Sequence, residues 1–142
     1  MSKSQSTAKI IKHLNQLLAQ EHACAIRYAT HAAIVSGPYA EQISARLKEI
    51  STDELLHAET LRGRVLALGG TPTMEVAVKD LIPAKTLTKI LSVNIKEEKQ
   101  AIVEYTALLK MIPKENVILY QSIEEIIRDE QEHLEELEAL RS

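Results

Sequence analysis

The sequence predicts an all-α fold, a four-helix bundle of two antiparallel hairpins joined by a long crossover. Four long segments repeat apolar residues at every third or fourth position, which is the period of a helix with one buried face. Apolar residues make up 45% of the chain, which contains only four Gly and four Pro. A length of 142 residues is usual for one domain. We therefore expect a single domain over residues 1–142, with a flexible tail at residues 1–6.

Helix breakers set the order and the approximate ends of the four helices. We expect helices at about residues 6–36, 39–68, 84–111 and 115–141. The first ends before Gly37-Pro38, the second stops at Gly69-Gly70, and the third stops before Pro113. The first and last connections are turns of a few residues, which make antiparallel hairpins. Residues 71–83, in contrast, are enough to cross the length of a bundle.

Every apolar stripe is interrupted near its middle by a glutamate, and two stripes also carry a histidine. The second and fourth helices each place a Glu-x-x-His pair on the buried face, and the first and third each place one glutamate there. These glutamates meet in one layer of an antiparallel bundle. The stripe of the third helix also includes Ile102 and Leu109, and that of the fourth runs on to Leu140. The polar residues of the layer, called the ligand set below, are Glu21, Glu54, His57, Glu98, Glu130 and His133.

Four carboxylates in an apolar core repel one another and lose their hydration unless cations neutralise them. Two divalent metal ions cancel four negative charges, and a neutral imidazole adds one nitrogen ligand to each metal. The pattern therefore predicts a two-metal site, for which carboxylate and imidazole ligands suit iron and manganese alike. We expect Glu54 and Glu130 as bridges, Glu21 with His57 on one metal, and Glu98 with His133 on the other.

Four further residues lie close to the ligand set in the sequence. Asp53 and Asp129 each precede a motif glutamate and are placed to accept the second ring N–H of a ligating histidine on a neighbouring helix. Tyr28 and Tyr105 each follow a ligand by seven residues. They are interpreted either as core side chains or as groups that exchange an electron or a hydrogen bond with the site.

Other polar residues receive simpler interpretations. Glu97 falls off the stripe of the third helix and is expected on its solvated face. Cys24 is the only cysteine, which excludes an internal disulfide and any Cys-based zinc or iron site, and it is expected to be a small packed side chain. Surface or interface positions are expected for His13, His22 and His31.

The overall charge of −3 gives no reason to expect binding to nucleic acid or to an anionic membrane. Lys3 and Lys9 lie in the polar start of the chain, for which a frayed terminus is preferred to DNA contact. That start lacks the apolar stretch of a signal peptide, and no later segment is apolar enough to span a membrane. We expect a cytoplasmic protein without a membrane partner.

Over residues 10–141 the sequence resembles the bacterioferritin branch of the ferritin superfamily. The resemblance implies a ferritin-like bundle with ferroxidase activity, in which Fe²⁺ is oxidised by O₂ or H₂O₂ at two irons per subunit and Fe³⁺ is stored as mineral in a homo-oligomeric cage. It also implies a catalytic position for Tyr28, where the family has a tyrosine near the irons. Three segments carry the resemblance: Leu-Asn-Gln-Leu-Leu-Ala-Gln-Glu21, Asp-Glu54-Leu-Leu-His57-Ala-Glu and Arg-Asp-Glu130-Gln-Glu-His133-Leu-Glu-Glu-Leu-Glu.

The sequence departs from the family pattern in two places. The family has a haem-ligating methionine directly after the first motif glutamate, where this chain has Leu55, so a haem between subunits would need another ligand. The sequence stops at Ser142, without the short fifth helix of larger shells, which favours a cage of twelve subunits over one of twenty-four. Twelve-subunit cages of the DNA-protecting type usually place their iron site between subunits, in contrast to the site predicted here.

Two alternative functions use the same pattern. A rubrerythrin-like di-iron peroxidase would reduce peroxide without storing mineral, but such proteins have an additional carboxylate on the third helix, where this chain has Ile95 and Ala101. They also have cysteines for a rubredoxin centre, which this chain lacks. A metal-free bundle or DNA-coating protein would require the inward glutamates to be paired by other means.

Overall fold

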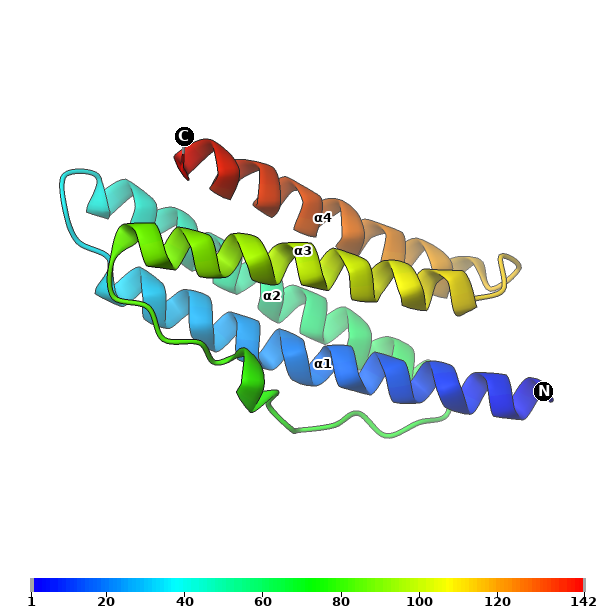
Figure 1. Ribbon diagram of the computed structural model, residues 1–142. Coiled ribbons are helices and arrows are strands. Elements are labelled where there is room, and N and C mark those ends of the chain that lie inside the picture. The colour runs from blue at the N-terminus through cyan, green and yellow to red at the C-terminus, as the bar shows by residue number, and fades with distance from the viewer. Residues whose placement is uncertain (1, 142) are drawn as a thin grey trace.

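The computed structural model describes residues 2–141, and within that range it contains four long α-helices and no strand. Helices α1 and α2 form one antiparallel hairpin and α3 and α4 form the other (Figure 1). Each hairpin packs along the other, with α1 beside α3 and α2 beside α4. The predicted all-α bundle is therefore confirmed. The elements are α1 (Lys3–Ile34), α2 (Ala40–Ala67), the 3-10 turn η1 (Val78–Asp80), α3 (Leu87–Met111) and α4 (Val117–Arg141).

The start of α1 differs from the expected flexible tail. The hydroxyl of Ser2 accepts a hydrogen bond from the backbone N–H of Gln5 at 3.2 Å, and the Gln5 side chain accepts one from the Ser2 N–H at 2.8 Å. This reciprocal capping satisfies N–H groups that a helix start otherwise leaves unpaired. Residues 3–6 are therefore helical, while Met1 lies outside the described residues.

The start of α3 differs from the prediction by three residues, because Thr86 forms the cap. Its hydroxyl accepts from the backbone N–H of Lys89 at 3.2 Å, which fixes the first helical residue at Leu87 rather than at position 84. After α2 the chain turns at Gly69, which has a φ of 89°, a conformation that glycine adopts without a steric penalty.

The buried apolar side chains form two clusters, one towards each end of the bundle. The first includes Leu14, Leu61 and Ile123, and the second includes Leu47, Ile95 and Leu137. Between these sets of positions each helix carries its part of the ligand set, so the polar layer divides the core.

The predicted stripes overestimated burial at three places. Ile102 and Leu109 are only half-buried, and Leu140 is 43% exposed because it lies in the terminal turn of α4.

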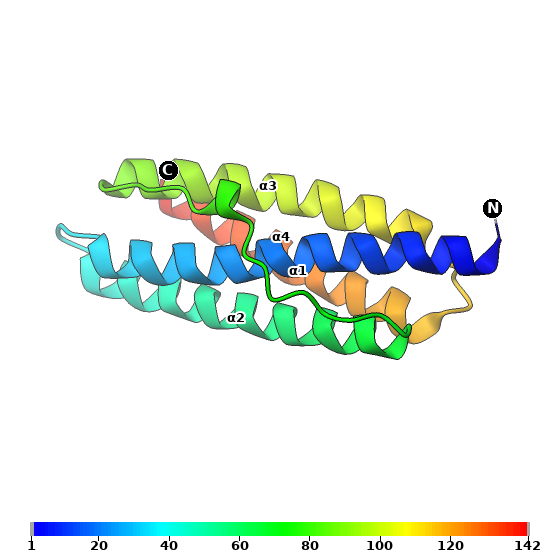
Figure 2. The same cartoon turned by 90° about the horizontal axis from the view of Figure 1, so that it is seen from below.

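The crossover follows α1 from one end of the bundle to the other before it enters α3 (Figure 2). Four side chains of α1 donate hydrogen bonds to its backbone carbonyl groups, at distances between 2.7 and 3.0 Å. The donors are Asn15, His22, Arg27 and His31, and their acceptors are the carbonyls of Thr71, Glu75, Asp80 and Ile82.

The expected surface position is wrong for His31, which is only 1% exposed. Its Nε2 donates to the Ile82 carbonyl at 2.9 Å, and its Nδ1 accepts from the amide of Asn94 at 2.9 Å. Both ring nitrogens are therefore occupied, which allows a neutral imidazole to be buried. His13 and His22 are half-buried.

Among the described residues, no helix combines the length and the apolar character needed to cross a membrane.

Candidate metal centre

The structure brings all six members of the ligand set together at the centre of the bundle, and none is more than 4% exposed. They form two groups, and within each group the ligand nitrogen and oxygen atoms lie within 4.8 Å of one another. Glu54 and Glu130 belong to both groups, which is the geometry that two bridging carboxylates require. Glu21 and His57 complete one group, and Glu98 and His133 complete the other.

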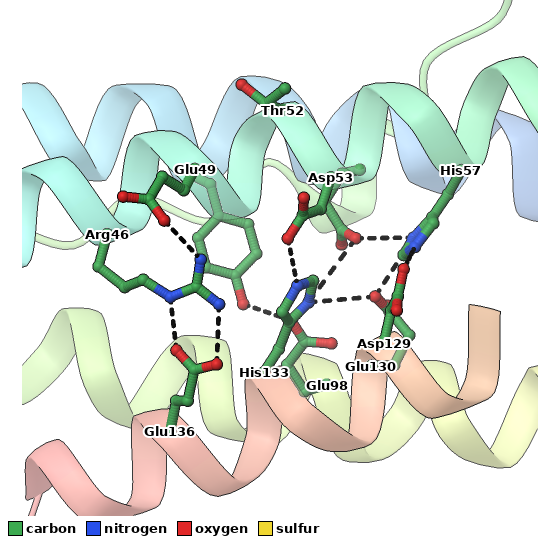
Figure 3. Close-up of polar contacts among 12 residues, drawn as sticks. Arg46, Glu49, Thr52, Asp53, His57, Glu98, Asp129, Glu130, His133 and Glu136 are labelled. Atoms are coloured by element: carbon green, nitrogen blue, oxygen red, sulfur yellow. Dashed lines mark hydrogen bonds and ion pairs between the residues drawn. The ribbon is translucent and has the colours of Figure 1, made fainter. Parts of the chain in front are cut away.

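Each histidine turns Nδ1 towards the carboxylates and Nε2 towards an aspartate on the opposite helix (Figure 3). His57 on α2 donates from Nε2 to Asp129 on α4 at 2.8 Å, and His133 on α4 donates to Asp53 on α2 at 2.9 Å. The predicted contacts of the two aspartates are confirmed. Because these bonds fix each ring, Nδ1 is the nitrogen that is left to face a metal.

The two buried tyrosines contact the ligand set across the bundle rather than along their own helices. Tyr28 on α1 donates its hydroxyl hydrogen to Glu98 Oε2 on α3 at 2.6 Å, and Tyr105 on α3 donates to Glu21 Oε2 on α1 at 2.9 Å. Seven residues along one helix correspond to a rise of about 10 Å, so the ligand on the same helix is out of reach of a hydrogen bond. Spacing in the sequence thus indicated proximity but not the partner.

Burial and mutual repulsion favour protonated carboxyl groups when no metal is bound. Burial and the neighbouring Glu54 raise the pKa of Glu98, and burial together with Glu54 and Glu98 raises that of Glu130 well above its usual range. For the histidines, burial alone lowers the pKa. The carboxylates of Glu21 and Glu54, each 3.0 Å from Nδ1 of His57, outweigh it and raise the pKa of His57 to about 12.

Burial also lowers the pKa of His133, but the carboxylate of Glu98, with a smaller contribution from Asp53, outweighs burial and raises this pKa to about 9. Both imidazoles are therefore cationic at neutral pH in the metal-free protein, and their charge offsets part of the carboxylate charge. Nδ1 must lose its proton before it can bind a metal, so metal binding is coupled to proton release.

Several atoms that face the centre of the layer have no hydrogen-bond partner among residues 2–141. They are Oε1 of Glu54 and Glu98, both carboxylate oxygens of Glu130, and Nδ1 of His133. Three of them have ion-pair contacts instead: Glu54 Oε1 lies 3.0 Å from Nδ1 of His57, and Nδ1 of His133 lies 3.3 Å from Glu130 Oε1. Unpaired polar atoms in a protein interior cost free energy, and a native structure retains them when something else satisfies them. Carboxylate oxygens and imidazole nitrogens are common ligands of divalent iron and manganese, so the donor set fits two such ions.

The sequence analysis missed a buried arginine behind Glu98. Arg27 is 3% exposed and donates from Nε to the Asn94 side chain at 2.9 Å. Its guanidinium lies 5.4 Å from the ring centre of Tyr28 and 3.7 Å from a carboxylate oxygen of Glu97. The expected solvated position of Glu97 is wrong, because its side chain is only 16% exposed beside this cation.

One signal of this network was visible in the sequence. Asn94 lies one helical turn before Glu98 and therefore on the same buried face of α3, where an amide needs polar partners. No local pattern, however, identifies Arg27 as that partner, because the two residues are 67 positions apart. Cys24, the single cysteine, is half-buried beside Arg27, whose Nη2 donates to its sulfur at 3.5 Å.

Fold and site together define the ferritin-like class of four-helix bundles, in which carboxylates and histidines from facing helices project into one central layer. The chain belongs to the ferritin family and resembles its bacterioferritin branch. The family profile described as the ferritin-like domain matches residues 11–142. The bacterioferritin of Desulfovibrio desulfuricans is 31% identical over 129 residues, which cover 89% of this chain and 71% of that relative.

Solved structures agree with this family. A ferritin-like di-iron-carboxylate protein from Bacillus anthracis superposes with a TM-score of 0.90 at 30% identity, and the match covers 100% of both chains. A dodecameric thioferritin from Bacteroides fragilis, a bacterioferritin-related protein, superposes with a TM-score of 0.85 over 94% of this chain and 84% of its own. At 21% identity the second likeness shows the fold alone.

Proposed function

We propose that this protein oxidises Fe²⁺ to Fe³⁺ at a two-metal site inside each subunit and stores the Fe³⁺ in a cage of identical subunits. The observation that carries the proposal is the pair of buried ligand groups that share Glu54 and Glu130 and that each include a histidine held by an aspartate. Membership of the ferritin family and similarity to bacterioferritins support it.

The ligand chemistry explains why such a layer favours oxidation. Carboxylate oxygens are hard, anionic donors, and in a buried layer their attraction to a cation grows with the cation charge. They therefore stabilise Fe³⁺ more than Fe²⁺. A pair of Fe²⁺ ions gives up two electrons together, which matches the reduction of O₂ to H₂O₂ or of H₂O₂ to water, with two protons taken up in each case.

The proposed roles follow the two groups of the site. Glu54 and Glu130 would be shared by the two ions, and each histidine would offer Nδ1 while an aspartate retains its Nε2 hydrogen. Tyr28 orients the Glu98 carboxylate through its 2.6 Å hydrogen bond, which is the catalytic role we assign to it. The outer ligands are Glu21 with His57 on one ion and Glu98 with His133 on the other.

Assembly and further cofactors belong to the same proposal. A protein of the same fold is dodecameric, and a twelve-subunit cage of this chain stays a prediction. Leu55 has no donor atom and is 56% exposed, so it supplies no ligand to a haem between subunits. The same ligands can bind manganese. We prefer iron because the match to a di-iron-carboxylate protein covers the whole of this chain. The cytoplasmic location stays a prediction.

Anaerobic titration of the metal-free protein with Fe²⁺ tests the proposal. We expect saturation at about two Fe²⁺ per chain, followed on exposure to O₂ or H₂O₂ by oxidation much faster than that of free Fe²⁺. Glu125→Gln, at an exposed position on α4, is a matched control that should behave like the parent protein. Saturation near one ion per chain, or oxidation at the rate of free Fe²⁺, contradicts the proposal.

Storage is tested separately by adding Fe²⁺ in large excess and measuring particle mass and iron content. A cage that keeps far more iron than its two-metal sites can hold supports storage. Rapid oxidation without retained iron favours the rubrerythrin-like peroxidase instead, because that function needs the same ligands but no mineral.

A further inference from the structure

Three buried side chains, Arg27, His31 and Asn94, link α1, α3 and the crossover, and each is at most 3% exposed. Nε of Arg27 lies 2.9 Å from Oδ1 of Asn94. Nδ2 of Asn94 lies 2.9 Å from Nδ1 of His31 and 2.8 Å from the Ile90 carbonyl oxygen. Nε2 of His31 lies 2.9 Å from the carbonyl oxygen of Ile82 in the crossover. The three side chains are called the crossover latch below, and none of them belongs to the ligand set.

Arg27 fixes the direction of the hydrogen bonds in the crossover latch. A guanidinium has only donors and keeps its proton, so the atom of Asn94 that faces Arg27 must be the amide oxygen. The amide nitrogen of Asn94 then faces His31 and donates to it. Nδ1 of His31 is therefore the nitrogen without a hydrogen, and Nε2 donates to the Ile82 carbonyl. The latch thus accepts only the neutral form of His31, in one tautomer.

A second proton on His31 would break this arrangement. It would set an N–H at Nδ1 against an N–H of Asn94, so that two donors face each other. Rotating the Asn94 amide does not relieve the conflict, because its nitrogen would then face the donor of Arg27. The buried imidazolium would also lose its hydration, which costs free energy where no anion is paired with it.

The charges around His31 oppose the second proton as well. On α1 the neighbouring charge is the guanidinium of Arg27, and burial together with Arg27 lowers the pKa of His31 from its ordinary value of 6.5. On the crossover, Lys85 lines the same surface cavity as His31, and the carboxyl group of Asp80 interacts with Glu97. The amide that α3 presents to His31 is uncharged.

A surface cavity of about 250 Å³ lies beside His31 and gives a charged imidazole a place to regain water. Ile26 and Ile34 of α1 line it, together with Leu81 and Ile82 of the crossover. A ring that turns into this cavity leaves the Ile82 carbonyl. The crossover then loses one of its attachments to α1.

We propose that the crossover latch is a pH-sensitive switch: neutral His31 holds residues 78–86 against α1, and protonation of His31 on acidification releases them. The open form binds one proton more than the closed form, so closure is complete above about pH 6.5 and weakens as the pH falls below it. Arg27 lies over the Tyr28 ring and donates to the Asp80 carbonyl, so release of the crossover loosens the cover over Tyr28. The switch does not depend on the proposed two-metal site, because no metal ligand takes part in it.

Hydrogen–deuterium exchange of the full-length protein between about pH 8 and pH 5 tests the switch. The backbone amides of Asp80 and Leu81 are the reporters, because both are hydrogen-bonded in the turn η1. Their rates are corrected for the pH dependence of amide exchange itself. We expect the corrected rates to rise by about tenfold for each pH unit below about 6.5, because opening takes up one proton.

Variants of the latch assign the proton to His31. His31→Gln retains a donor for the Ile82 carbonyl but takes up no proton, so its corrected rates should not vary with pH. Asn94→Asp should keep the crossover closed down to about pH 5, because a carboxylate accepts hydrogen bonds from Arg27 and from protonated His31 alike. His13→Gln, the same substitution on the same helix, is the matched control. It should keep the pH dependence of the parent protein, because the His13 ring contacts the sulfur of Met111.

Corrected rates of the parent protein that do not change with pH overturn the switch. It is also overturned if His31→Gln keeps the pH dependence, because another group then takes up the proton. Opening of Asn94→Asp at the same pH as the parent protein has the same meaning. If His31→Gln fails to fold, Asn94→Asp decides, because it keeps His31 and changes only the group that Nδ1 faces.

Discussion

The two sides of the metal centre carry the same ligands but differ in what lies behind them. Glu21 is contacted by Tyr105 and borders a crevice, whereas Glu98 is contacted by Tyr28, which Arg27 and the crossover cover. The ligands come from two similar hairpins. The crossover, however, occurs once in the chain and passes along α1. A near-repeat can thus build a symmetrical site, while a single unrepeated segment makes its two sides different.

The largest expected effect comes from removing a ligand that both sides of the metal centre share. Glu130 belongs to both groups of ligands, so Glu130→Ala should lower the rate of Fe²⁺ oxidation by about a hundredfold or more. Stopped-flow oxidation assays measure this rate, and circular dichroism checks that the variant is still helical. Glu132→Ala, at an exposed position on the same helix, is the control. An unchanged oxidation rate in Glu130→Ala contradicts a bridging role.

The next largest effect is expected from replacing the aspartates that hold the two histidines, one on each side of the metal centre. Asp129→Asn weakens the hold on His57, and Asp53→Asn weakens that on His133, because an amide accepts the Nε2 hydrogen less strongly than a carboxylate does. Each variant should lower metal affinity by about 10- to 100-fold in one of the two binding steps.

Competition between the protein and a chelator for Co²⁺ measures both steps. The contacts are nearly equal in length, at 2.8 and 2.9 Å, so similar losses are expected in the two variants. Two unaltered binding steps would show that the aspartates do not support the ligands.

Replacement of Arg27 should make the two sides more alike. Arg27→Met removes the donor to Asn94 and to the Asp80 carbonyl and leaves Glu97 without its cation. Breaking a buried charged network of this kind costs about 3 kcal/mol in the free energy of unfolding. Urea unfolding of the metal-free protein measures the loss, with Arg128→Met on the exposed surface as control. A change below about 0.5 kcal/mol is typical of a surface substitution and would contradict a stabilising role of the buried Arg27 network.

The smallest expected effect is a pH dependence of the metal-free protein. The pKa of His133 is about 9 in the folded chain against an ordinary value of 6.5, so the folded state holds this proton more tightly than the unfolded state. The resulting stability is complete below about pH 6.5 and is lost as the pH rises through about 9. The raised pKa of Glu130 acts in the same direction.

Calorimetry of metal-free and Zn²⁺-loaded protein over this pH range tests the effect. We expect the metal-free protein to lose about 2 kcal/mol of stability with rising pH, and the loaded protein to lose much less, because its ligands have already released their protons. A metal-free protein that gains stability over the same range would contradict the assigned protonation.

The bundle could be predicted from sequence because periodicity is a local property. Each helix was recognisable from its own stripe and breakers. The largest displacements, three residues at the starts of α1 and α3, occur where the side chains of Ser2 and Thr86 form caps. Burial was less predictable at helix ends. Leu140 continues the stripe of α4 but is exposed, because the pattern within one helix does not say where neighbouring helices cease to cover it.

The members of the site could be named from sequence, but their surroundings could not. Glutamate on an apolar stripe is unusual enough to be noticed, which is why all six residues of the layer were named in advance. The burial of Arg27 and His31 was not predicted, since arginine and histidine on a helix next to a stripe are common on surfaces. Their burial depends on carbonyl groups of the crossover, more than fifty positions away in the chain.

The fastening of the crossover has a consequence for how this protein tolerates change. Four side chains of α1 donate hydrogen bonds to the crossover, and in every case the acceptor is a main-chain oxygen, which any amino acid supplies. Substitution of exposed side chains such as Met74 and Val78 therefore leaves these four hydrogen bonds in place. An engineer seeking room for a grafted peptide or a label would begin there.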